Sequence, residues 1–365
     1  TAAVLIDKIN SLSALRIAID IPSGLFGDGH PEDQRAHIVQ AHHTLTFQQP
    51  KLSFFFAENE KYVGRFHVLD IGLHPAFIAD AETPFHFVTR AFVHPLLPSR
   101  PVFSHKGTFG HALLIAGSKG KTGAAVLCAR ACLRSGAGLV TVKTSAWGMN
   151  VLQEAVPEAM LEENEESDVV AGHIRPEKYS AIGMGPGTGT EKQTEGTLKM
   201  LIQDYAGPLV LDADALNIIS GNRTILSFLR RETILTPHPG EFDRLTEKHS
   251  SGYERMKTQR ELSVKRGIFI VLKGAFTSVS CPDGSVYFNS SGNPGMAKGG
   301  SGDALTGMIT GLLARGMNER DACILGVYLH GLAGDIAASV HSREGMTAGD
   351  LIENIGGAWR MLSGE

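Results

Sequence analysis

The sequence predicts an α/β protein. A partial, smaller α/β domain is followed by a larger domain with a mostly parallel sheet and helices on both faces. After residue 101, short apolar segments alternate with longer amphipathic or Ala-rich segments, which is the pattern of a parallel sheet with crossover helices. Prolines are frequent between residues 72 and 100, as in a connecting segment. We therefore expect one domain over residues 1–100 and a second over residues 101–365.

The expected strands define where a ligand site could form, because such sites lie at strand ends. In the first domain they cover residues 15–22, 43–48 and 66–71; the first reads as a buried strand ending at Asp20, with a Gly-rich loop after it at 23–29. In the second domain they are Ala112–Ala116, Leu139–Lys143, Ala181–Met184, Leu209–Asp212, Thr233–Leu235 and Ile268–Lys273. Helices are expected at 122–136 and 191–205, a hairpin at 277–281 and 285–289, and a mostly helical end from Gly302 on. Ligands of open α/β sheets bind beyond the carboxyl ends of the strands, so we look for a site there.

The composition narrows the function classes. The net charge is −4 and no block rich in Lys and Arg occurs, which argues against a nucleic-acid partner. A helix that spans a bilayer needs about 20 apolar residues. We expect no apolar run of that length in this sequence, and hence no membrane partner. The four cysteines form no Cys-x-x-Cys pair, and Cys128 and Cys132, four apart in an Ala-rich run, are expected to pack in a core. This usage predicts a reducing, cytoplasmic location.

Two glycine clusters come close to nucleotide-binding motifs without matching them. Residues 117–122 contain Gly-Lys-Thr, but a P-loop requires glycine at the position of Ile115. Residues 183–189 approach the dinucleotide fingerprint Gly-x-Gly-x-x-Gly, whose last glycine is replaced by Thr188. We interpret the first cluster as a turn between strand and helix, and the second as a turn that faces a ligand.

Residues 293–307 carry the strongest chemical signal. The run Gly299–Gly302 is followed at once by Asp303, and a helix is expected to begin near Gly302. The free N–H groups and positive dipole end of a helix N-terminus favour a phosphate or a developing anion. A carboxylate in that first turn could accept a proton from an attacking hydroxyl, so Asp303 is the predicted catalytic base. A plain helix-capping role is the alternative.

Polar clusters also follow three other expected strands. Residues 212–217 hold two acids and an amide, which indicates a polar edge of a site. In residues 236–241, His238 stands between two prolines that fix the backbone, which favours a substrate contact over a merely packed or surface histidine. Lys273, with a glycine directly after it, suits a nucleotide phosphate.

In this order, the clusters resemble the ribokinase-like superfamily and, within it, closely resemble the NAD(P)H-hydrate dehydratases. The matching segments cover nearly all of 101–365, namely residues 105–110, 117–123, 185–189, 212–217, 236–241, 273–275 and 293–303. The resemblance implies a three-layer αβα domain that repairs NADH or NADPH hydrated at C6 of the nicotinamide. ADP or ATP would phosphorylate the C6 hydroxyl of the S form, and phosphate would leave. The products would be NAD(P)H, phosphate, and AMP or ADP.

The resemblance also implies roles for individual residues. Asp303 would be the base. The nucleotide would be lined by Lys273, Gly274, Ala275, Phe276, Thr277, Gly299, Gly300, Ser301 and Gly302. The hydrated cofactor would face Ala124, Gly187, His238 and Asp303. Mg²⁺ would come with the nucleotide. Dehydratases of this family commonly assemble as tetramers, so a homo-oligomer is expected.

The first domain carries a resemblance of its own. Residues 20–25 and 70–73 look like the C-terminal half of the Rossmann-like NAD(P)H-hydrate epimerase domain. By resemblance, Asp20 would contact the hydrated nicotinamide and Ser23 would help bind K⁺. The earlier half of that domain, with its Asn-Gly-Gly-Asp-Gly-like loop, has no counterpart in this sequence. Epimerisation is therefore expected of the longer parent protein rather than of this chain.

Two other functions stay open. A small-molecule kinase of the same superfamily, acting on a hydroxymethylpyrimidine or a sugar, would share the turn before Asp303. Such a kinase should lack the combination of Thr-Pro-His-Pro-Gly-Glu with Gly-Pro-Gly-Thr-Gly that this sequence has at 236–241 and 185–189. A catalytically silent binding protein is compatible with the incomplete first domain, but the intact Asp303 turn argues against it for residues 101–365. No residue decides between ADP and ATP by a physical argument.

Overall fold

The structure is a computed structural model, and it describes residues 2–28, 37–164 and 168–364. Internal contacts divide the chain into two units. The first comprises residues 1–87 and 249–258, and the second residues 88–248 and 259–365. The boundary expected between residues 100 and 101 therefore falls inside the second unit.

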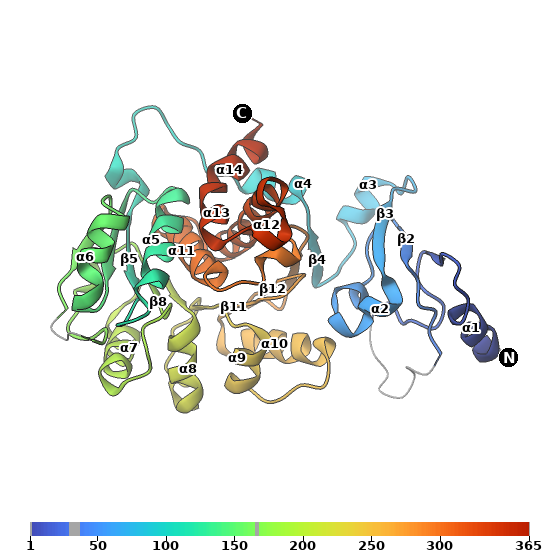
Figure 1. Cartoon of the computed structure of the whole chain (residues 1–365), viewed down its shortest axis with the longest axis horizontal. Coiled ribbons are helices and arrows are strands. Elements are labelled where there is room, and N and C mark those ends of the chain that lie inside the picture. Colours follow the sequence, from blue (N-terminus) through green and yellow to red (C-terminus); the bar gives the residue numbers. More distant parts are fainter. Residues whose placement is uncertain (1, 29–36, 165–167, 365) are drawn as a thin grey trace. The chain divides into compact units, whose positions relative to one another are not determined.

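The first unit contains a small parallel sheet in the order β1-β2-β3 (Figure 1). Its helices and strands are α1 (Ala2–Asn10), β1 (Ile17–Ile19), β2 (His43–Phe47), α2 (Glu60–Val63), β3 (Arg65–Leu69) and α3 (Pro75–Ala79). The boundary between the units falls within β4 (Phe85–Val88), which is a strand of the larger sheet. The expectation of a buried first strand is wrong, because Ile17 and Ile19 are 52% and 62% exposed. The physical reason is that β1 is an edge strand that pairs only with β2 among the described strands. Gly29, the end of the expected Gly-rich loop, lies outside the described residues.

The second unit is built on a ten-stranded sheet in the order β4-β13-β12-β11-β10-β9-β8-β5-β6-β7. The strands from β11 to β7 are all parallel, and β12 is antiparallel to both of its neighbours. The strands are β5 (His111–Ile115), β6 (Leu139–Lys143), β7 (Met160–Glu162), β8 (Ala181–Met184), β9 (Leu209–Leu211), β10 (Ile234–Leu235), β11 (Phe269–Leu272), β12 (Ser278–Ser280) and β13 (Val286–Asn289). Every strand and the hairpin expected after residue 101 is found, whereas β7 was missed, because three residues carry too little periodicity.

The helices of this region follow the expected alternation, with α6 as an addition. They are α4 (Arg90–Val93), α5 (Thr122–Arg134), α6 (Ala146–Ala155), α7 (Lys192–Asp204), α8 (Ala213–Gly221), α9 (Pro239–Leu245), α10 (Gly252–Arg266), α11 (Ser301–Ala314), α12 (Glu319–Gly345), α13 (Ala348–Glu353) and α14 (Ile355–Ser363). The short 3₁₀ helices of this region are η3 (His94–Leu96), η4 (Lys106–Phe109), η5 (Pro176–Lys178), η6 (Arg223–Ser227) and η7 (Pro294–Met296), and those of the first unit are η1 (Leu52–Phe55) and η2 (Ala57–Asn59).

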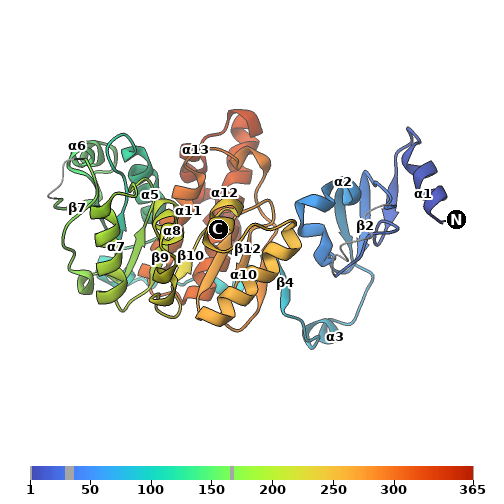
Figure 2. The ribbon, with the colours of Figure 1, turned by 90° about the horizontal axis from the view of Figure 1, so that it is seen from below.

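The large sheet is apolar on both faces, because successive side chains of a strand point to opposite sides. In β5, Leu114 belongs to one buried cluster, together with side chains of α5, α11, α12 and α14. Its neighbours Leu113 and Ile115 belong to the other, with side chains of α7, α8 and α9. Figure 1 shows α7 and α8 on one side of the sheet and α11 to α14 on the other, and Figure 2 views the unit from the α7–α8 side. The predicted three-layer αβα architecture is confirmed.

Helix α11 packs directly on α5 through a glycine. A Cβ atom built on Gly307 would lie 2.1 Å from the carbonyl oxygen of Cys128. Only a residue without a side chain allows the two backbones to approach this closely. The expected core packing of Cys128 and Cys132 is confirmed, since both thiols are free and fully buried in α5. This packing fixes the position of α11 and, with it, the position of Asp303.

We expect Gly307→Ala to destabilise the second unit by about 1–3 kcal/mol, because the methyl group overlaps the α5 backbone. The matched control is Gly196→Ala in the middle of α7, where an added Cβ meets nothing within 4 Å. That change should be neutral or stabilising by up to about 1 kcal/mol, since alanine is the better helix former. Urea denaturation of both variants measures the free energies of unfolding. Equal effects would show that the close approach is not required.

Helix α12 corrects one expectation from composition. By length and composition alone, residues 319–345 could cross a membrane, although no such apolar run was expected. Most of the apolar window is buried inside the unit, where α12 packs on α11 and α14. Its apolar character is therefore explained by its place in the core.

Candidate active site

The loops singled out in the sequence meet at the carboxyl edge of the large sheet. Strand β8 leads into Gly185–Gly189, β9 into Asp212, β10 into Thr236–Glu241, and β11 into Lys273. These strands are parallel neighbours in the sheet, so their carboxyl ends lie side by side. The site can therefore be built from segments up to about ninety positions apart in the chain.

Lys273 and Asp212 form the centre of this edge. The Nζ atom of Lys273 donates to Oδ1 of Asp212 at 2.8 Å and lies 3.8 Å from Oε2 of Glu241. The Asp212 side chain is only 1% exposed, and its Oδ2 accepts a hydrogen bond from Thr306 Oγ1 at 2.7 Å. Burial would lower the pKa of Lys273, but the charges of Asp212 and Glu241 outweigh it and raise the pKa above its ordinary value. Lys273 is therefore a permanent cation at the site.

Helix α11 brings its N-terminus to this cation. Gly300 precedes the helix with φ of 96°, a left-handed conformation that favours glycine. A Cβ atom on Gly302 would lie 3.4 Å from Nζ of Lys273. The first N–H groups of a helix have no partner within the helix, and they carry its positive dipole end. Together with Lys273 they form a site suited to phosphate oxygens.

Asp303 stands in the first turn of α11 beside this anion site. Its carboxyl group is half-buried. Burial and the charges of Asp212 and Asp214 raise the pKa of Asp303 to about 6, against the opposing effect of Lys273. A carboxylate with a pKa this close to neutrality is a better proton acceptor than an ordinary aspartate, yet it is still ionised at pH 7.

Asp214 and the glycine turn after β8 lie on the other side of Asp212. Oδ2 of Asp214 accepts hydrogen bonds from Gly189 N at 2.9 Å and from Lys121 Nζ at 3.2 Å. In the same turn, a Cβ atom on Gly187 would lie 3.2 Å from Cβ of Ala124. The structure thus brings Gly187 and Ala124, two residues that the sequence predicted to face one ligand, into direct contact.

His238 has a structural explanation that the sequence did not show. Its Nδ1 accepts hydrogen bonds from the backbone N–H groups of Gly240 at 3.1 Å and Glu241 at 3.4 Å. Glu241 returns the contact, because its Oε2 accepts from the N–H of His238 at 2.8 Å. The pair caps the N-terminus of α9. The other ring nitrogen, Nε2, lies 3.5 Å from Oε1 of Glu241, and the side chain of His238 is still 51% exposed.

The segment after β11, predicted to line a nucleotide, turns back on itself. The hydroxyl of Thr277 donates to the carbonyl oxygen of Gly274 at 3.0 Å, and the N–H of Gly274 donates to that hydroxyl at 3.2 Å. Ala275 and Phe276 lie between them at the tip of the turn. The segment is therefore a short hydrogen-bonded turn that directly follows Lys273.

The carboxylates at this edge do not by themselves form a metal site. Across residues 2–28, 37–164 and 168–364, no group of three His, Cys, Asp or Glu side chains is arranged to hold a metal ion. Mg²⁺ commonly binds through one or two carboxylates together with the phosphates of a nucleotide. Asp214, which is 16% exposed, is the nearest such carboxylate to consider, and its two oxygens accept hydrogen bonds from Lys121, Gly189 and Asn217.

The comparisons with known proteins decide the family. The family described as NAD(P)H-hydrate dehydratase matches residues 112–356. A bifunctional NAD(P)H-hydrate repair enzyme of Moorella thermoacetica is 36% identical over 96% of this chain and 68% of its own length. The chain belongs to the NAD(P)H-hydrate dehydratase family. The ADP-dependent (S)-NAD(P)H-hydrate dehydratase of Bacillus subtilis is 36% identical over 75% of this chain and 98% of its own length.

Solved structures agree with the dehydratase assignment. An ADP/ATP-dependent NAD(P)H-hydrate dehydratase from Bacillus subtilis, co-crystallised with ATP and Mg²⁺, has a TM-score of 0.64 at 31% identity. It aligns with 76% of this chain and 98% of its own. A ribokinase-like protein from Enterococcus faecalis has a TM-score of 0.69 at 28% identity, with 78% and 99% covered. The ribokinase-like fold predicted from the sequence is therefore confirmed.

The front of the chain also matches a family, described as YjeF-related protein N-terminus, over residues 1–53. Asp20, predicted to contact a hydrated nicotinamide, has φ of 63°, which is unusual for a residue other than glycine. Its Oδ1 accepts from Lys51 Nζ at 2.8 Å and from the N–H of Phe47 at 3.0 Å. Burial would raise the pKa of Asp20, but these contacts outweigh it and lower the pKa. Ser23, the predicted K⁺ ligand, is exposed.

Two residues of the dehydratase edge were missed in the sequence. Thr306 lies one turn beyond Asp303 and ties α11 to Asp212. His330 lies on α12, and its Nε2 donates to the carbonyl oxygen of Ser301 at 2.9 Å. Burial, together with the charge of Lys273, lowers the pKa of His330 to about 4, so the ring is neutral. Thr306 lies within residues 293–307, which carry the strongest chemical signal of the sequence, but no local pattern marks a histidine inside a long apolar helix.

Proposed function

We propose that this chain dehydrates hydrated NADH or NADPH, using ADP or ATP as the phosphoryl donor, and so acts as a hydro-lyase. The observation that carries the proposal is the placement of Asp303, with its raised pKa, next to a phosphate-binding helix N-terminus and Lys273. Membership of the dehydratase family supports the substrate, and the relative co-crystallised with ATP and Mg²⁺ supports the donor.

The residues at this edge would divide the reaction into steps. Asp303 takes the proton of the C6 hydroxyl while the oxygen of that hydroxyl attacks the terminal phosphorus of the nucleotide. The bond from that phosphorus to the bridging oxygen breaks, which leaves AMP from ADP or ADP from ATP. Lys273 and the first N–H groups of α11 stabilise the charge on the transferring group. The ring nitrogen then expels phosphate from C6, and loss of a proton from the neighbouring ring carbon restores NAD(P)H.

The remaining predicted residues fit around this centre. The turn Gly274–Thr277 and the run Gly299–Gly302 are proposed to hold the nucleotide, because both adjoin Lys273. Ala124, Gly187 and His238 are proposed to face the hydrated nicotinamide. Asp214 would be the carboxylate that helps to hold Mg²⁺, which would neutralise charge on the nucleotide phosphates.

Further proposals concern the first unit, the assembly of the protein and its location. A contact of Asp20 with hydrated nicotinamide and a K⁺ ion at Ser23 are proposed from the front match alone. Epimerase activity is proposed for the longer protein type to which the bifunctional relatives belong. Assembly into a homo-oligomer and a cytoplasmic location stay predictions.

One assay separates this function from the alternatives. The protein is mixed with hydrated NADH and either ADP or ATP, and the near-ultraviolet absorbance of NADH is followed. We expect the absorbance to return with at least one nucleotide and to stay constant without any. No return with either nucleotide contradicts the dehydratase function. Phosphorylation of a hydroxymethylpyrimidine or a sugar in its place would favour the kinase alternative.

The pKa of Asp303 predicts the pH dependence of this reaction. The base must be ionised to accept a proton, so kcat/KM should rise with pH through about 6 and level off above 7. The negative charge of Asp214 contributes to the raised pKa, so Asp214→Asn should move the rising limb to lower pH. Initial rates between pH 5 and 8 measure the rising limb of the native protein and that of Asp214→Asn. A flat profile over that range would remove Asp303 from the rate-determining proton transfer.

A further inference from the structure

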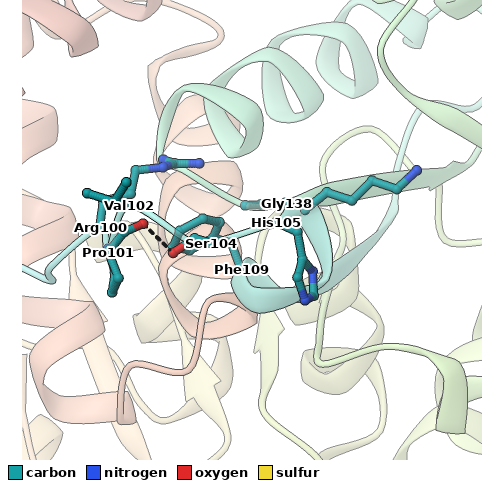
Figure 3. Close-up of a pocket in the computed structure, with 9 residues that line it drawn as sticks. Arg100, Pro101, Val102, Ser104, His105, Phe109 and Gly138 are labelled. Carbon is teal, nitrogen blue, oxygen red and sulfur yellow. Dashed lines mark hydrogen bonds between the residues drawn. The ribbon is translucent and has the colours of Figure 1, made fainter.

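A cavity of about 440 Å³ lies at the opposite end of the large sheet from Asp303. It is lined by Arg100, residues 104–106 and Phe109, and by Gly138. Helix η4 precedes β5 and Gly138 precedes β6, so the cavity lies at the amino ends of these parallel strands. Figure 3 shows Arg100 and His105 on opposite sides of the pocket, with Phe109 between them. It therefore shares no part of the candidate active site.

Two arginines come together beside this cavity. The guanidinium carbon of Arg100 lies 4.0 Å from the centre of the Phe109 ring, and that of Arg315 lies 5.5 Å from it. Both guanidinium groups reach within 4 Å of the position that a Cβ on Gly136 would take. Burial and the charge of Arg100 lower the pKa of Arg315. The fold therefore holds two like charges close together. Arg315 donates to the carbonyl oxygen of Ser135 at 3.4 Å and lies over the Phe109 ring, and a bound anion would remove the remaining repulsion between the two guanidinium groups.

The lining residues add one further cation, Lys106, and no acidic side chain. Lys106 and His105 line the same cavity, and Arg315 lines an adjoining cavity of about 490 Å³ on the other side of η4. Neither cavity has an acidic side chain in its lining. Within the described parts of the chain, neither Arg100 nor Arg315 forms an ion pair with a carboxylate. By contrast, the nearby Arg130 and Arg134 are both paired with Glu353.

We propose that this basic pocket, lined by Arg100, His105 and Lys106 and flanked by Arg315 of the adjoining cavity, is a second binding site for a phosphate-bearing small molecule. One guanidinium group can donate two parallel hydrogen bonds to two phosphate oxygens. The charge of several cations is balanced better by a di- or triphosphate than by a single carboxylate. A volume of about 440 Å³ lies within the range of small-molecule sites. The shared chemistry is a polyphosphate, whether free or attached to a nucleoside.

Trp359 provides a reporter for the test. Its ring centre lies 5.9 Å from the guanidinium carbon of Arg315. The chain has two tryptophans, so Trp147→Phe leaves Trp359 as the single fluorophore. Inorganic tripolyphosphate, inorganic phosphate and ATP are titrated into this protein with ADP and excess Mg²⁺ already saturating the active site. Equilibrium dialysis of labelled tripolyphosphate gives the stoichiometry.

We expect a saturable change in Trp359 fluorescence and one bound tripolyphosphate per chain. Arg100→Gln should weaken binding at least about tenfold, and Arg315→Lys, which keeps the charge but loses the planar fork, should weaken it less. The matched control is Arg130→Gln, an exposed arginine outside the pocket, which should bind as before. Tighter binding of ATP than of tripolyphosphate would show that the pocket recognises a nucleotide. Equal binding would show that it contacts the phosphate groups alone.

Three results would overturn the proposal. The first is the absence of a bound equivalent when ADP occupies the active site, and the second is an equal effect of Arg100→Gln and Arg130→Gln. The third is a change in molecular mass by light scattering for Arg100→Gln without any polyphosphate binding. In that case the arginines contact carboxylates of a second copy of the chain. Because the readout is binding, its failure leaves the proposed dehydratase activity untouched.

Discussion

Turnover of hydrated NADH is expected to fall by about 10²–10⁴-fold in Asp303→Asn, while the nucleotide still binds. Asparagine keeps the shape of the side chain but cannot accept the hydroxyl proton at any pH. Loss of a negative charge beside Lys273 does not weaken phosphate binding, so the Kd for ADP should stay the same or decrease. The return of NADH absorbance measures the rate, and calorimetry measures the nucleotide affinity.

The control for Asp303→Asn is Asp204→Asn at the end of α7, an exposed position remote from the carboxyl edge of the sheet. It should retain full activity. Turnover of Asp303→Asn above about a tenth of the native rate would show that a water or another carboxylate takes the proton. Loss of nucleotide binding together with turnover would point to a disrupted α11 N-terminus rather than to a missing base.

Lys273→Met is expected to lower the free energy of unfolding of the second unit by about 3–5 kcal/mol. The substitution leaves the carboxylate of Asp212, which is 1% exposed, without its charge partner, and Glu241 loses a nearby cation. The same change removes the cation next to Gly302, so ADP affinity should fall at least about tenfold. Urea denaturation and calorimetry measure the two effects separately.

Two variants sharpen this prediction. Lys199→Met breaks an exposed pair with Glu195 on α7, where the lysine side chain is 47% exposed, and should change the stability by less than about 0.5 kcal/mol. Adding Asp212→Asn to Lys273→Met removes the lone buried charge and should restore part of the stability, but not the nucleotide affinity. A loss below about 1 kcal/mol for Lys273→Met would mean that Asp212 finds compensation elsewhere.

Much of the second unit could be predicted because its signals are local. Apolar runs such as Leu139–Lys143 and Ala181–Met184 became strands with the expected bounds, since burial on both faces of a parallel sheet demands continuous apolar sequence. The first strand of the chain misled for the same reason. Apolar residues around Ile17 indicate a buried strand, but only the neighbouring elements determine whether anything covers it.

The candidate site was predictable in its parts but not in its connections. The sequence marked Asp303 and Lys273 separately, because each follows a glycine-rich or strand-end pattern. Nothing in the sequence indicated that Thr306 donates to one carboxylate oxygen of Asp212 and Lys273 to the other, since these residues lie 94 and 61 positions from Asp212 in the chain. His238 shows the converse, because a residue chosen for function also caps the helix that follows it.

By itself, the sequence determined that this chain folds as a strand–helix alternation with its polar loops at one edge, and that those loops carry the dehydratase motifs. Periodicity and turn chemistry act over a few residues, so they can be read along the chain. Only the tertiary structure decided that Asp303 is a carboxylate with a pKa of about 6 and that Arg100 meets Arg315 at the far end of the sheet. Burial and Coulomb interactions depend on distance through space, which the order of residues does not contain.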